Sequence, residues 1–260
     1  MVDAEVLHGM LIGLTTLISA ATGLLLEKTR AWWLADDAHF GVVSRARSAR
    51  GPVLVIAGIL IAAGAVLLFP FSHVIPVDSG TGAFAPGSAG TVDPGTPNSA
   101  DIILLGLILG IVAAATPFLI TADTLVRRLP DRLVYPLIVV CLLTLVLGSL
   151  IGEPRIWFFG LIAGSGAAGV FAALHLVGKV LHVRTMGPGD VKLAFVVFSA
   201  AGLFDAWAPA LVLIAMMLIA GIWALIAVAV QRRMRGITIA FGPAMLSGMW
   251  LGSVLAPILL

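Results

Sequence analysis

The segment 186–193, MGPGDVKL, places one carboxylate behind two glycines at the start of an apolar stretch. An ionisable group there loses part of its hydration, so Asp190 is by default a candidate for function. A second carboxylate, Asp123, follows an unbroken apolar run and precedes a basic turn. Asp131, which follows Pro130 in that turn, is explained as the N-terminal cap of the next helix. Asp123 and Asp190 could share a site in which one carboxyl is ionised and the other protonated, an arrangement that activates water for peptide hydrolysis.

The composition indicates the elements that must position these residues. Of the 260 residues, 60% are hydrophobic and only 11% are charged, and the mean hydropathy is +1.14. Soluble domains carry roughly 25% charged residues, and about 20 apolar residues cross a bilayer core of about 30 Å. The sequence therefore predicts an all-α, polytopic membrane protein of about eight spans, the sixth of them short. The predicted spans are 6–26, 52–76, 101–122, 133–152, 156–180, 190–204, 208–231 and 239–259.

The positive charges predict the orientation of the chain. If eight spans alternate in direction, every Lys and Arg residue except Arg155 falls on one side of the membrane. The positive-inside rule makes that side cytoplasmic and both termini extracytoplasmic. Asp123 and Asp190 then lie at the same depth, near the cytoplasmic surface.

The chain divides into two predicted parts. Residues 1–100 hold two spans, a basic cytoplasmic loop at 27–51 and a Gly-, Ser- and Pro-rich linker at 77–100 that reads as flexible. Residues 101–260 hold six spans, in which Gly106/Gly110 and Gly160/Gly164 have the spacing that permits close helix packing. Cys141 is the one cysteine and lies inside a span, so neither a disulfide nor a thiolate metal site is expected, and we expect no metal and no cofactor.

Three motifs carry a family resemblance. Residues 187–193, GPGDVKL, resemble the GxGDxKL motif of the type IV prepilin peptidases, membrane aspartic proteases that share GxGD with presenilin. Residues 123–136, DTLVRRLPDRLVYP, look like that family's other signature, an aspartate followed eight residues later by the aspartate of Leu-Pro-Asp. Residues 240–243, AFGP, are similar to the family's Gly-Pro pair near the C-terminal helix. The resemblance covers about residues 101–260.

The resemblance implies a role for each matching residue. Asp123 and Asp190 match the two catalytic aspartates, and Gly187 and Gly189 match glycines that let the backbone approach the substrate. Lys192 matches a family lysine whose role the sequence leaves open. The other residues that fall on the motifs are Pro130, Asp131, Gly242 and Pro243.

The resemblance also implies an activity and its setting. The expected enzyme is an aspartic endopeptidase that removes the short basic leader of pilin-like precursors at the cytoplasmic face of a prokaryotic plasma membrane. Its expected partners are those precursors and membrane lipid, without nucleic acid; the oligomeric state is not predicted. Fuller members of the family carry two CxxC pairs linked to N-methylation of the cleaved pilin. The loop 27–51 has no cysteine, so the sequence predicts the short form without methyltransferase activity.

The helix dipole gives one further expectation. It favours negative charge at the start of a helix and disfavours it at the end. Because Asp190 opens one predicted helix and Asp123 closes another, we expect Asp190 to be the ionised base and Asp123 the protonated acid.

Other functions fit the same aspartates. A proton-coupled transporter would use them as carriers, but it predicts ionisable groups near the bilayer midplane and inverted repeats, and the sequence has neither. An inactive assembly scaffold has no need of both aspartates. Two unrelated interfacial aspartates are the remaining, purely structural explanation.

Overall fold

The computed structural model describes residues 4–29, 40–69, 99–127, 129–182, 187–231 and 240–259, with side chains for all of these except 4–5, 40–49 and 231. The predicted linker at 77–100 therefore lies outside the described residues, except for its last two positions. Within the described part, the secondary structure is helical and contains no strand. The helices are α1 (Ala4–Lys28), α2 (Phe40–Leu67), α4 (Ser99–Val126), α5 (Asp131–Ile151), α6 (Pro154–Val180), α7 (Pro188–Gly202), α8 (Ala208–Gln231) and α9 (Gly242–Leu259).

The helices confirm a helical membrane protein. Seven of those that the structure describes are long and apolar enough to cross a membrane. The exception is α7, the short sixth span of the prediction, whose 15 residues rise about 22 Å. Whether α7 forms an eighth span, and on which side the termini lie, stay predictions.

The structure corrects the predicted loop at 27–51. Helix α2 begins at Phe40, inside that loop, and ends at Leu67, so the predicted span 52–76 is also wrong at its C-terminal end. Residues 40–50 contain alanine, arginine, valine and serine and neither proline nor glycine beyond Gly41, so nothing in them stops a helix from extending past the bilayer. Hydropathy predicted only the part of α2 that is apolar.

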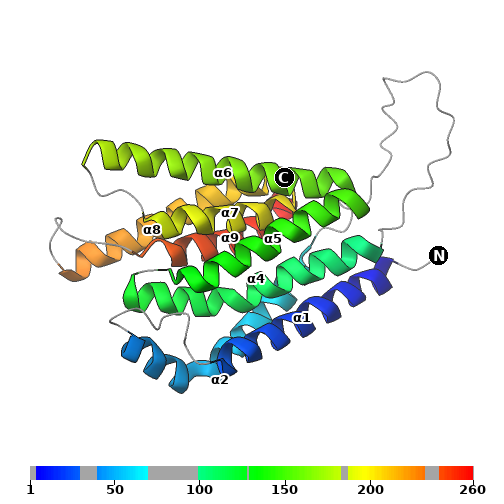
Figure 1. Ribbon diagram of the computed structural model, residues 1–260, viewed down its shortest axis with the longest axis horizontal. Helices are drawn as coiled ribbons and strands as arrows, with labels where there is room; N and C mark the ends of the chain where they lie inside the picture. Colours follow the sequence, from blue (N-terminus) through cyan, green and yellow to red (C-terminus); the bar gives the residue numbers. More distant parts are fainter. Residues whose placement is uncertain are drawn as a thin grey trace.

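Helix α4 is the centre of the bundle. It lies between α1 and α2 on one side and α5, α7 and α9 on the other (Figure 1). Of its most apolar stretch, 83% is buried within the protein, against 17% for α8 at the periphery. A helix at the periphery exposes an apolar surface to lipid, whereas α4 is covered by other helices on most of its surface. Helix α4 is therefore the central helix.

The two predicted glycine pairs lie at close helix contacts, as their spacing indicated. A Cβ on Gly110 would stand 2.8 Å from the carbonyl oxygen of Thr15 in α1, and Gly106 packs against the same helix. Gly160 and Gly164 pack against α7 in the same way. Side chains at these positions would force the helices apart.

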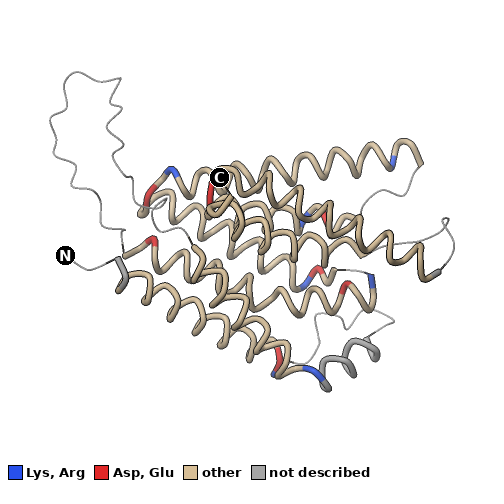
Figure 2. Tube along the Cα trace, turned by 180° about the vertical axis from the view of Figure 1, so that it is seen from behind, with Lys and Arg blue, Asp and Glu red and all other residues tan. Residues whose placement is uncertain are grey.

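Charged residues lie towards the two ends of the bundle, and the middle of the helices is almost free of them (Figure 2). One carboxylate at the end opposite Asp123 is buried: Asp101 is only 2% exposed. It accepts hydrogen bonds from Trp157 Nε1 at 2.7 Å and from the backbone N–H of Glu153 at 3.1 Å. These bonds join the start of α4 to the α5–α6 turn.

Candidate active site

Asp123 lies in the last turn of α4 and is 4% exposed. Its Oδ2 accepts a hydrogen bond from the backbone N–H of Gly242, the first residue of α9, at 2.9 Å. A Cβ on Gly242 would lie 2.7 Å from that oxygen, so only glycine fits without moving the carboxyl group. The AFGP motif, 119 residues further along the chain, is thus part of the immediate surroundings of Asp123.

Asp190 is the third residue of α7 and is partly buried. Its Oδ2 accepts a hydrogen bond from the backbone N–H of Gly187, the residue that precedes the helix, at 3.0 Å. This contact satisfies one N–H at the start of α7 and orients the carboxylate. Gly189 packs on Leu129, where an added Cβ would stand 3.2 Å from the leucine Cβ.

A three-residue contact, which we call the lysine clamp, joins α7 to α5. Lys192 Nζ donates a hydrogen bond to Asp131 Oδ1 at 2.7 Å and lies 4.3 Å from the centroid of the Tyr135 ring. Asp131 and Tyr135 are four residues apart at the start of α5, so the lysine lies across one helical turn. The clamp therefore holds the start of α7, with Asp190, against the segment that follows Asp123.

The three sequence motifs converge at one end of the bundle. The end of α4 and the starts of α5, α7 and α9 meet there through the contacts of Asp123 with Gly242, Gly189 with Leu129 and Lys192 with Asp131. Asp123 also lies within electrostatic range of Asp190. A negative charge on one of these carboxyls disfavours ionisation of the other, because like charges repel.

The start of α9 changes the size of the expected dipole effect. Asp123 lies at the end of α4, where the dipole is unfavourable for a negative charge. It also receives the first N–H of α9, where the dipole is favourable. Asp190 lies only at the start of α7, so the dipoles still favour its ionisation over that of Asp123, by less than the sequence alone predicts.

Pro130, Asp131 and Pro243 form no hydrogen bond with the two carboxyls. Pro130 is buried and precedes α5, and Asp131 makes no side-chain capping bond there; instead it binds Lys192. Pro243 is buried in the first turn of α9. Met186 of the opening motif lies outside the described residues.

Sequence reasoning missed the contribution of Tyr135. It is the one tyrosine of the chain, and it follows Asp131 by one helical turn. That spacing could have indicated that both face the same neighbour. The neighbour itself, Lys192, is 61 residues away from Asp131 and could not be found from sequence spacing.

Within the part of the chain that the structure describes, no three histidine, cysteine, aspartate or glutamate side chains come close enough to hold a metal ion. Cys141 is buried and unpaired. Comparison with protein-family models, with curated proteins and with solved structures finds no match for this chain.

Proposed function

We propose that this protein is a membrane aspartic endopeptidase of the prepilin peptidase type, with Asp123 and Asp190 as its catalytic pair. The observation that carries the proposal is the convergence of three motifs, far apart in the sequence, around these two carboxyls at one end of the bundle. Unrelated interfacial aspartates would have no reason to bind a Gly-Pro helix start and a GxGD turn at the same end of the bundle.

The reaction is hydrolysis of a peptide bond by water held between the two carboxyls. The ionised carboxylate accepts a proton from the water, whose oxygen attacks the carbonyl carbon, while the protonated carboxyl donates a hydrogen bond to the carbonyl oxygen. The tetrahedral intermediate then breaks its C–N bond, and the nitrogen leaves as an amine with the proton that the first carboxylate accepted from the water, which returns that carboxylate to its ionised form. Gly187 is exposed, so the backbone just before α7 is open to an extended substrate, while Gly189 allows the start of α7 to pack closely on Leu129.

The substrate class follows from the resemblance and from the setting of the site. We expect a pilin-like precursor with a short basic leader followed by an apolar helix that lies in the bilayer beside the bundle. The site lies at a helix end rather than at the midplane, so a bond at the membrane surface is within its reach. With the positive-inside orientation, that surface is cytoplasmic. The chain has one cysteine, so N-methylation through CxxC pairs is not part of the proposal.

The test is to co-express the chain with pilin-like precursors and to follow removal of the leader by mass spectrometry. The wild-type chain is expected to cleave the precursor, and Asp123→Asn and Asp190→Asn are each expected to abolish cleavage. Asparagine keeps an acceptor oxygen for the N–H of Gly242 or Gly187, so both variants should fold. Glu153→Gln, a change of the same kind at the opposite end of the bundle, is the control and should cleave normally. Unchanged cleavage in both aspartate variants would overturn the proposal.

A further inference from the structure

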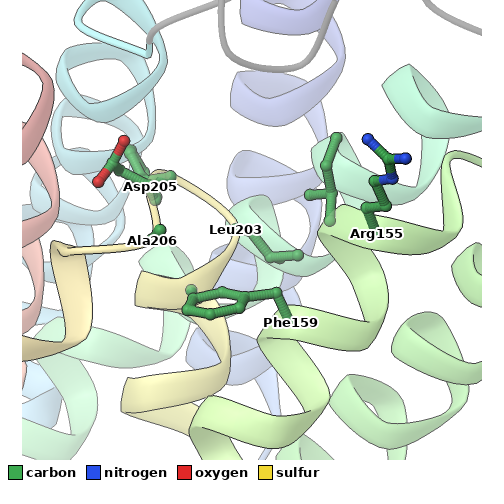
Figure 3. Close-up of a pocket in the computed structure, with 8 residues that line it drawn as sticks. Arg155, Phe159, Leu203, Asp205 and Ala206 are labelled. Carbon is green, nitrogen blue, oxygen red and sulfur yellow. The ribbon is translucent and has the colours of Figure 1, made fainter. Parts of the chain in front are cut away.

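A pocket lies at the end of the bundle opposite the two aspartates, where α6 begins and α7 ends. Its volume is about 300 Å³, near the lower limit of ligand pockets and sufficient for a small polar group. Phe159 and Leu203 form its floor, and Arg155 and Asp205 lie on opposite sides of its rim (Figure 3). The whole length of α7 separates Asp190 from Asp205, so this pocket is distinct from the proposed active site.

Arg155 carries a charge that no described residue compensates. It is exposed, and it makes neither a hydrogen bond nor an ion pair with any residue of the described part. It is also the one Lys or Arg residue that the predicted topology places at this end of the protein. Arg155 belongs to the first turn of α6, whose N-terminal dipole adds to the attraction for an anion. A guanidinium in this position matches a phosphate, which it can bind through two parallel hydrogen bonds.

Asp205 gives the pocket a second, opposite charge. Its Oδ1 accepts the backbone N–H of Trp207 at 2.7 Å, which fixes the carboxylate at the rim, and Asp205 takes part in a further interaction. An ionised carboxylate has about four acceptor positions, so these contacts leave room for an additional donor. A plain anion would be attracted by Arg155 and repelled by Asp205. A molecule with a phosphate at one end and an N–H-bearing ammonium at the other satisfies both.

The surroundings indicate where such a molecule comes from. Trp207, which follows the pocket, is 66% exposed, and tryptophan at a helix end is typical of the level of the lipid headgroups. The apolar floor suits a glycerol backbone or the start of an acyl chain. We propose that this pocket binds a phosphoethanolamine group, presented as the headgroup of a lipid, with its phosphate on Arg155 and its ammonium on Asp205.

The test is native mass spectrometry of the full chain, released from micelles that contain equal amounts of phosphatidylethanolamine, phosphatidylcholine and phosphatidylglycerol with identical acyl chains. Phosphatidylethanolamine adducts are expected to exceed each of the others about tenfold, which corresponds to about 1.4 kcal/mol. Arg155→Gln should reduce these adducts by a similar factor. Lys179→Gln removes a positive charge from the other end of the same helix and should leave them unchanged.

Asp205→Asn tests the second contact. The amide oxygen can still accept the N–H of Trp207, so the turn is kept, but the preference for the primary ammonium over the quaternary ammonium of phosphatidylcholine should disappear. Addition of free O-phosphoethanolamine distinguishes the two sources of this chemistry: displacement of the lipid means that the soluble group suffices, and retention means that the acyl chains are needed. Equal binding of phosphatidylglycerol, or an Arg155→Gln variant that keeps its adducts, overturns the proposal. Neither result depends on the peptidase activity.

Discussion

Replacement of Lys192 by methionine is expected to reduce peptide cleavage far more than it reduces stability. Methionine keeps the length of the side chain and removes the charge, and with it the contacts to Asp131 and Tyr135. Lys192 is two residues from Asp190 on the same helix, and it contacts neither carboxyl of the proposed pair, so it has no direct chemical role. We infer that it is a positioning residue, a role that rests on the proposed peptidase.

The loss of folding stability and the loss of cleavage rate in Lys192→Met can each be estimated, the first of them from the exposure of the clamp. The side chains of Lys192 and Asp131 are 24% and 56% exposed, and ion pairs of this kind contribute about 0.2–1 kcal/mol. The contact with the half-exposed Tyr135 adds about 0.5–1 kcal/mol. The loss of stability is therefore about 1–2 kcal/mol, which a folded domain tolerates. By contrast, a displacement of about 1 Å between catalytic groups can cost about 100-fold in rate.

The assay measures kcat and KM for leader removal and the free energy of unfolding in the same micelles. Lys192→Met is expected to lower kcat about 100-fold with little change in KM, because the clamp orients Asp190 and does not bind the substrate. Asp131→Asn should have a similar effect. The variant that carries both changes should have the same kcat as each single variant, because each of the three variants loses the same Lys192–Asp131 contact. Lys179→Gln is the control for the loss of a lysine charge.

Two results would refute this reasoning. The first is a Lys192→Met variant whose kcat stays within about tenfold of the wild type, since a fall of that size needs no displacement of Asp190. The second is a double variant in which the losses add, which would mean that Lys192 and Asp131 act separately. If Asp123→Asn and Asp190→Asn also keep their activity, the peptidase proposal fails; if they lose it while Lys192→Met is normal, only the clamp fails.

Three further changes have expected outcomes. Gly242→Ala places a Cβ 2.7 Å from Oδ2 of Asp123, which is too close, so this carboxyl must shift and cleavage should fall about 100-fold while the helix content by circular dichroism is unchanged. Trp157→Phe removes the Nε1 donor to the buried Asp101 and should lower the free energy of unfolding by about 1.5–3 kcal/mol, measured by denaturant titration in micelles; no change would mean that another donor replaces it. His182→Gly relieves a left-handed backbone angle (φ 55°) on an exposed residue and should raise the unfolding free energy by up to about 1 kcal/mol, whereas a decrease would mean that the imidazole makes a stabilising contact.

The environment of Asp123 explains why the Gly-Pro pair lies so far from the aspartates in sequence. A carboxyl at the end of α4 meets the unsatisfied carbonyls of its own helix, which is unfavourable for a charge. The start of α9 supplies an N–H and a dipole of the opposite sign at the same place. The glycine gives that N–H access to the carboxylate, and the proline that follows begins the helix without needing a hydrogen-bond partner of its own.

Much of the architecture could be predicted from composition alone, because a bilayer demands long apolar helices and little else. Seven of the eight helices that the structure describes follow the predicted apolar stretches, and the glycine pairs at 106/110 and 160/164 lie at close contacts as their spacing indicated. The second span was wrong at both ends: α2 begins at Phe40, in a polar region that hydropathy does not detect, and ends at Leu67, before the predicted end at residue 76. The burial of Asp101 also escaped prediction, because its donors lie more than 50 residues away.

For the candidate site, the residue types and their order along the chain were enough to select Asp123 and Asp190 and to pair them at one depth. What only the tertiary structure decided is how they are held: Gly242 on Asp123, Leu129 beneath Gly189 and the lysine clamp between α5 and α7. It also decided that Asp123, at the end of α4, receives an N–H from the start of α9, which makes the dipole difference between the two carboxyls smaller than the sequence predicts. The surroundings of the two carboxyls could not be predicted because helix packing brings the ends of four helices together. The charge and hydrogen bonding at one helix end then depend on neighbours that no local pattern records.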